Sequence, residues 1–83
     1  MTYKKLYSLN LVAYILLVSK QEPVLGKDPN TGSVYFLYPD DNATNFLIAT
    51  YKNGNPQVGL KDLTKAFNHI RTIMRAFRYG GER

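Results

Sequence analysis

The sequence predicts a small α+β domain whose elements follow the order (β)αββα(β)α. Three observations support this class: an apolar run over residues 9–18, two β-prone segments within residues 24–38, and an amphipathic segment over residues 60–78. Because the chain has only 83 residues, we expect one domain over residues 1–83 that ends in a flexible tail at residues 79–83.

The N-terminal segment predicts a short strand followed by a helix. Residues 3–7 contain two β-prone tyrosines, and their lysines discourage pairing of a free sheet edge. Ser8 is a suitable N-cap for a helix that continues to about Ser19. Apolar residues surround this helix on all sides, so we expect it to be buried on most sides or to lie in a subunit interface.

The middle of the chain predicts a β-hairpin. Residues 24–27 form the first strand, and residues 28–32 have the composition of a turn, with Pro, Asn and Gly together. Residues 33–38 form the clearest strand of the chain, which Pro39 ends.

A second helix is expected from Ala43 to Lys52, with Asp40, Asp41 or Asn42 as its N-cap. Gly54 is expected in the left-handed conformation that ends a helix. Residues 55–58 are expected to be extended or to form a short strand, because Pro56 restricts the backbone there.

The last predicted helix, over residues 60–78, has two distinct faces. Its apolar positions recur at spacings of three and four residues, with Ala66 and Ile73 on the flank. The residues of this apolar seam are Leu60, Leu63, Phe67, Ile70, Met74 and Phe77. The opposite face is basic.

Composition excludes several kinds of chemistry. The chain has no cysteine, so disulfides, thiolate metal sites and thiol nucleophiles are excluded, and one histidine cannot form a histidine metal cluster. We expect His69 to face solvent, and Asp28, Asp40 and Asp41 to serve in turns and caps rather than as an acid–base pair. The sequence therefore predicts no enzyme, no catalytic residue, no metal site and no cofactor.

Charge favours a polyanionic partner. The net charge is +5, and +4 of it falls within residues 59–83. We expect the basic residues of the last helix to contact nucleic-acid phosphate as a group. They are Lys61, Lys65, Arg71, Arg75 and Arg78. Two alternatives stay open: this face is merely solvated, or it contacts an acidic protein.

Tyrosine is the second abundant feature, with seven residues. In the strand over residues 33–38, Tyr35 and Leu37 point away from Val34, Phe36 and Tyr38, so both faces are apolar. Either helices cover both faces, or one face binds a partner. Bases that stack on Tyr35 near Lys27 are one interpretation, and cross-strand packing is the other.

The apolar run near the N-terminus is too short to cross a bilayer, and no small-residue cleavage site follows it, so we expect a soluble cytoplasmic protein without membrane contact. A helix that is apolar on all sides and the apolar seam together offer more apolar surface than a chain of 83 residues covers easily. We therefore expect a homodimer in which the seam is shared between core and interface.

The chain also resembles a known family. The run Lys5-Leu6-Tyr7-Ser8, the apolar helix, the segment at residues 33–38 and the final basic helix are similar in layout to short uncharacterised proteins of phages, prophages and mobile elements of Gram-positive bacteria. The similarity covers about residues 3–77. It implies a small accessory protein that binds nucleic acid or blocks a host protein, in the host cytoplasm, and it carries over no functional residue. A structural component of a virion or assembly is a further alternative.

Overall fold

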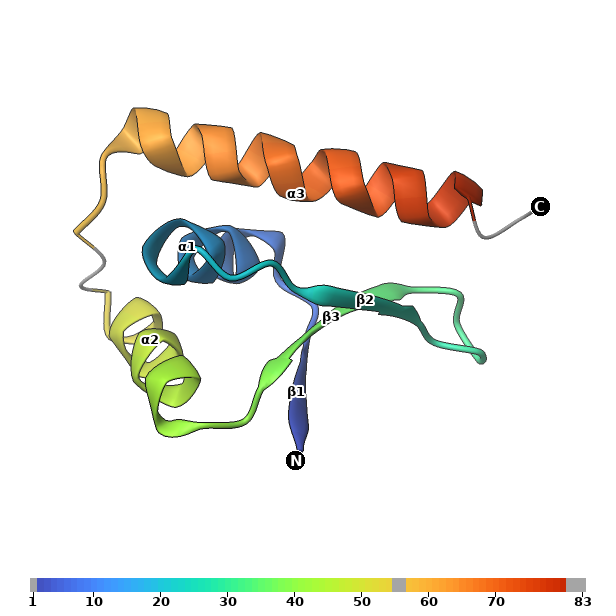
Figure 1. Ribbon diagram of the computed structural model, residues 1–83, viewed down its shortest axis with the longest axis horizontal. Helices are drawn as coiled ribbons and strands as arrows, with labels where there is room; N and C mark the ends of the chain where they lie inside the picture. The colour runs from blue at the N-terminus through green and yellow to red at the C-terminus, as the bar shows by residue number, and fades with distance from the viewer. Residues whose placement is uncertain (1, 55–56, 81–83) are drawn as a thin grey trace.

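The computed structural model describes residues 2–54 and 57–80 of the chain. It confirms the α+β class, with three strands and three helices among these residues (Figure 1). The elements are, in chain order, β1 (Tyr3–Leu6), α1 (Leu9–Ser19), β2 (Val24–Lys27), β3 (Val34–Pro39), α2 (Asn42–Lys52) and α3 (Leu60–Gly80).

The three strands form one sheet in the order β1-β3-β2. Both outer strands pair antiparallel with β3, so β1 and β2 run parallel to each other with α1 as their crossover. This arrangement is a split β-α-β unit. It confirms the predicted hairpin, because β2 and β3 pair directly, and it confirms the predicted edge strand, because β1 lies at one edge.

The two faces of the sheet differ in how deeply they are buried. Val34, Phe36 and Tyr38 alternate along β3 and are buried beneath α1, whereas Tyr35 and Leu37 point to the other face and stay half-buried. The Tyr38 hydroxyl donates a hydrogen bond to the backbone carbonyl of Gln21 at 2.9 Å. Burial, reinforced by the negative charge of Glu22, raises the pKa of Tyr38, so this donor stays protonated.

Helix α1 is the centre of the molecule. Ser8 is its N-cap, as predicted, and accepts a hydrogen bond from the backbone N–H of Leu11 at 3.3 Å. Five consecutive residues, Leu11 to Ile15, are buried. The sheet, α2 and α3 surround the helix (Figure 1), and the Tyr14 ring packs on the Tyr51 ring of α2 with centroids 5.8 Å apart. One chain therefore covers α1 from Leu11 to Ile15, whereas Val18 near its C-terminal end stays 44% exposed.

Helix α2 begins one residue earlier than predicted, at Asn42, with Asp41 as its N-cap. Gly54, beyond its C-terminal end, has a φ of +77°, which confirms the left-handed conformation expected there. Thr44 and Ile48 are the buried residues of α2.

One expectation at an element end is corrected. Helix α3 continues to Gly80 instead of ending at residue 78, because no helix-breaking residue precedes Gly80. Residues 79–80 are therefore helical and do not belong to the predicted flexible tail. The rest of that predicted tail, residues 81–83, lies outside the described residues. Residues 55–58 are expected from the sequence to be extended or to form a short strand. Of these two alternatives, the strand does not form at residues 57–58, and residues 55–56 lie outside the described residues.

Candidate nucleic-acid interface

Helix α3 packs against α1 through a narrower face than the sequence predicts. Ala66 and Ile70 are its buried residues, and Ile70 is fully inaccessible. Leu60, expected in the apolar seam, is 80% exposed. At about 100° per residue, Leu60 lies about 80° around the helix from Ile70 and about 120° from Ala66, so it points away from α1. The seam therefore contributes to the core mainly through its later members and through Ala66.

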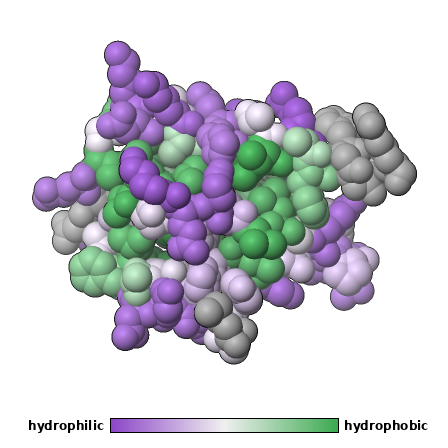
Figure 2. All heavy atoms as spheres, in the orientation of Figure 1, coloured by the Kyte–Doolittle hydropathy of each residue, from purple (hydrophilic) through white to green (hydrophobic). Residues whose placement is uncertain are grey.

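The five predicted basic residues all lie on α3 and are exposed. None of them takes part in an ion pair within residues 2–54 and 57–80. Figure 2 shows hydrophilic side chains along the upper edge of the molecule, where α3 runs, with hydrophobic side chains beneath them. The basic residues predicted from the sequence therefore all face solvent.

Two of the five residues share a shallow polar groove. Arg71 and Arg75, one helical turn apart, line it together with Asn68 and Thr72, and it encloses about 260 Å³. The Thr72 hydroxyl donates a hydrogen bond to the backbone carbonyl of Asn68 at 2.9 Å, which holds the Thr72 side chain at this edge of the groove. The structure therefore brings Arg71 and Arg75 together within the predicted group.

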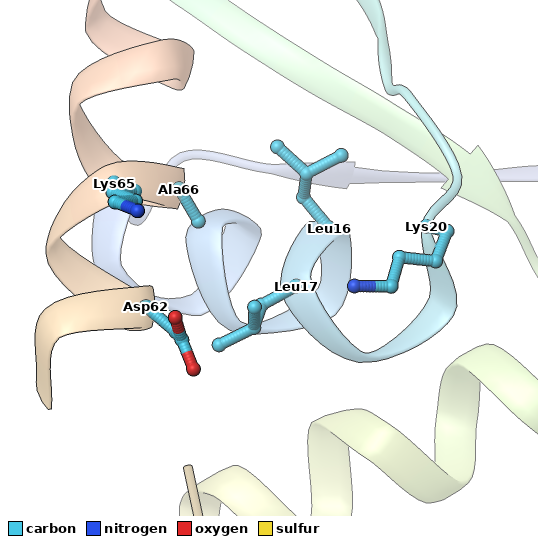
Figure 3. Close-up of a pocket in the computed structure, with 6 residues that line it drawn as sticks. All are labelled: Leu16, Leu17, Lys20, Asp62, Lys65 and Ala66. Atoms are coloured by element: carbon cyan, nitrogen blue, oxygen red, sulfur yellow. The ribbon is translucent and has the colours of Figure 1, made fainter. Parts of the chain in front are cut away.

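Lys65 belongs to a different surface. With Asp62 and Ala66 it lines an apolar groove of about 320 Å³ between α3 and the C-terminal part of α1, where Leu16 and Leu17 form the floor and Lys20 the opposite rim (Figure 3). The sequence does not indicate this groove, because its walls come from two helices that are distant in sequence. Its only local signal is the apolar pair Leu16-Leu17 at the end of α1.

His69 faces solvent, as expected, but it also pairs with Glu22. Its Nε2 lies 2.5 Å and 3.0 Å from the two carboxylate oxygens of Glu22, in the loop after α1. Both side chains are about half exposed, and an exposed pair of this kind contributes little to stability. The two residues are 47 positions apart, so spacing in the sequence offered no signal for the pair. No cluster of metal-binding side chains occurs in the described part of the chain.

The acidic residues singled out in the sequence have structural roles. Asp41 Oδ1 accepts a hydrogen bond from the backbone N–H of Thr44 at 2.8 Å. Asp28 Oδ1 accepts from the backbone N–H groups of Asn30 and Thr31 in the hairpin loop, and Asp40 Oδ1 accepts from the Asn45 side chain. The contacts of Asp41 and Asp28 confirm the cap and turn roles expected for them, whereas Asp40 holds the Asn45 side chain and does not cap α2.

Tyr35 lies on the open face of the sheet, but its cationic neighbour is not the predicted one. Lys27 pairs with Val34 across the sheet and so points to the opposite, helix-covered face. Instead, the Lys5 ammonium lies 4.8 Å from the centroid of the Tyr35 ring. The expectation of Lys27 beside Tyr35 is wrong because the register of β2 on β3, which the sequence does not define, decides the face.

Comparison with protein-family models, with curated proteins and with solved structures finds no match to this chain. Among the helices of the described ranges, none combines the length and the apolar character that a bilayer crossing needs.

Proposed function

We propose that this protein is a non-enzymatic nucleic-acid-binding module that contacts phosphate through the basic face of α3. The observation that carries this proposal is the pairing of Arg71 and Arg75 in one polar groove, both exposed and without an ion-pair partner in the described ranges. We also propose its setting: an accessory protein of a phage or mobile element that acts in the host cytoplasm.

The chemistry of the groove suits a phosphate. Each guanidinium presents several N–H donors in a planar fork that matches phosphate oxygens, and Asn68 and Thr72 add neutral polar groups beside them. One helical turn separates the Arg71 and Arg75 backbones by about 6 Å along the axis. Contacts of this kind position a protein on the backbone without reading sequence.

The proposal of a non-enzymatic role has its own support. The carboxylates that the sequence singles out as acid–base candidates, Asp28, Asp40 and Asp41, already accept hydrogen bonds that hold a loop and a helix end. Their recruitment for proton transfer would break the structure that positions them.

The salt dependence of duplex binding tests this function. Five phosphate contacts give a slope of log affinity against log salt of about −4.5, because each contact releases about 0.9 condensed counterions. Replacing both arginines (Arg71→Gln with Arg75→Gln) should bring the slope about 2 closer to zero. Titration of a short labelled DNA duplex at several salt concentrations measures it.

The matched control replaces two lysines that lie away from α3, Lys4→Gln with Lys27→Gln. It removes the same charge, and its slope should stay nearer the wild-type value. If the two double variants change the slope equally, or if only the lysine variant does, the contact does not lie on α3.

A second candidate function rests on the apolar groove between α1 and α3 (Figure 3). A module that blocks a host protein would use this groove to bury an apolar side chain of its target. Recovery of a protein partner from host lysate that survives nuclease treatment, and that is lost with Leu17→Lys, would favour this function. Recovery that nuclease abolishes favours the first.

A further inference from the structure

The sheet has an open face that the proposed phosphate site does not use. Side chains alternate along the strands, so Tyr3 and Lys5 of β1, Tyr35 and Leu37 of β3, and Val24 of β2 share this face. Tyr3 and Val24 are 52% and 58% exposed. Such a surface, apolar and aromatic yet uncovered in the described ranges, indicates a binding site.

The Tyr35 ring lies across the open face rather than standing up from it. A Cβ atom placed on Gly26, its cross-strand neighbour in β2, would fall 2.4 Å from Tyr35 Cε1. The ring therefore occupies the space that any other side chain at position 26 would fill. Tyr7, which is 55% exposed, packs edge-on against the same ring with centroids 6.1 Å apart.

Charge on the sheet identifies the kind of partner. The fourteen residues of β1, β2 and β3 include no carboxylate. Lys5 is their lysine on the open face, because Lys4 pairs with Tyr38 and Lys27 with Val34 on the opposite face. A second copy of this chain would bring lysine against lysine on this face, whereas a nucleic acid supplies phosphates. We propose that the open face binds single-stranded nucleic acid, whose bases stack on Tyr35 and Tyr7 while Lys5 meets the phosphate beside them.

The position of the Lys5 ammonium over the Tyr35 ring explains how a base could replace the ammonium on this ring. A cation is held there by the negative face of the aromatic ring, at 4.8 Å from the centroid. An arriving base has a π-face that takes the same place, and the flexible lysine stem lets the ammonium turn to the phosphate. A paired duplex cannot use this surface, since its bases are already stacked on one another.

This inference goes beyond the proposed function and does not depend on it. The open face lies on the side of the sheet away from α1, and the basic face of α3 points away from α1 on the other side of the molecule. One surface meets backbone phosphate, and the other meets bases. The two proposals therefore fail separately.

Two labelled oligomers distinguish stacking from phosphate contact: an oligothymidylate of about ten nucleotides, within the ~4–16 nucleotides that one small binding domain covers, and an abasic oligomer of equal length. The wild-type protein should bind the oligothymidylate more tightly. Tyr35→Leu should lower its affinity for oligothymidylate by about 5- to 150-fold, the equivalent of ~1–3 kcal/mol per stacked base. Tyr35→Phe keeps the ring and should keep the affinity.

Gly26→Ala provides a test that leaves every side chain of the surface in place. Its added methyl displaces the far end of the Tyr35 ring, so oligothymidylate binding should weaken as in Tyr35→Leu while far-UV circular dichroism stays unchanged. Tyr7→Ala removes the neighbouring ring and replaces Tyr35→Leu if that variant does not fold. The variant with Arg71→Gln and Arg75→Gln should keep the preference for oligothymidylate over the abasic oligomer.

Three results would overturn the inference. Equal affinity for the two oligomers would show that bases do not contribute. Unchanged oligothymidylate binding in both Tyr35→Leu and Gly26→Ala would place the bases elsewhere. A dimer in light scattering that Tyr7→Ala converts to a monomer would show that a second copy covers the face.

Discussion

Asp41 is a residue that could act in acid–base chemistry but serves as a helix N-cap in this structure. Hydrogen bonds from the backbone N–H and the side chain of Thr44 lower the pKa of the Asp41 carboxyl below its ordinary value of 3.8. The N-terminal end of α2 carries partial positive charge, and the ionised carboxylate stabilises it. Thr44, whose N–H is held in this way, is the buried polar residue of the core.

This cap makes stability depend on pH in a defined direction. Because the folded-state pKa is the lower one, the stabilisation is present above about pH 3.8 and is lost as the pH falls through the folded-state value. Asp41→Asn keeps an oxygen acceptor for the cap but does not titrate. The difference in melting temperature between wild type and Asp41→Asn should therefore shrink below pH 4.

Circular dichroism melts across this acidic range measure the effect. Asp28→Asn is the matched control, since Asp28 accepts similar bonds in the hairpin loop but caps no helix. A difference between wild type and Asp41→Asn that stays constant with pH would show that the charge of Asp41 does not stabilise α2.

At the scale of elements, the contact between α1 and α3 decides the fold. Ile70 is fully buried and packs into the core cluster beside residues of α1. Ile70→Ala should lower the free energy of unfolding by about 2–5 kcal/mol, because it removes buried methyl groups and leaves a cavity. Urea denaturation followed by circular dichroism measures the change.

Thr72→Ala is the control for Ile70→Ala, on the exposed side of the same helix. Exposed substitutions usually change stability by no more than about 0.5 kcal/mol, and alanine is the better helix former. Equal losses in the two variants would mean that α3 is stabilised by its own helical propensity rather than by α1.

The ends of elements could be predicted wherever a local interaction defines them. Ser8, Asp41 and Gly54 act within a few residues of their own helix, so the sequence indicates α1 and α2 correctly. The expectation that Leu60 belongs to the packed seam is wrong. Periodicity gives the width of an apolar stripe but not the part of it that a neighbouring helix covers.

At the scale of the whole molecule, the chain exposes 5756 Å². A compact monomer of its 9.5 kDa mass exposes about 5,000 Å². The apolar surround of α1 argues for a partner at its C-terminal end, where Val18 is 44% exposed, but not from Leu11 to Ile15, which one chain covers. The surface in excess of that of a compact monomer and the exposed Leu60 of α3 also argue for a partner.

We therefore expect a homodimer whose interface includes the outer part of the apolar seam. Light scattering at tens of micromolar, on the order of a weak dimer's dissociation constant, should give a mean mass between that of the monomer and that of the dimer, and Leu60→Gln should reduce it. Thr64→Gln, also on the exposed surface of α3, is the control and should leave the mass unchanged. A monomer mass for the wild-type protein would contradict this expectation.

Some features of the candidate sites could be predicted from the sequence and others could not. The basic face of α3 could be predicted as a group, because all five residues lie on one helix and a helical repeat places them together. The pairing of His69 with Glu22, the groove at Leu16 and Leu17, and the contact of Lys5 with Tyr35 could not be predicted, because each joins separate elements.

The sequence by itself determined the α+β class, the hairpin, the caps and the two-faced final helix, because hydrogen bonds and periodicity within a few residues specify them. Only the tertiary structure decided the insertion of β3 between β1 and β2, and with it which lysine reaches Tyr35. A shift of one residue in strand register exchanges the two faces of a strand. The packing of whole elements against α1 selects that register, and no local pattern encodes it.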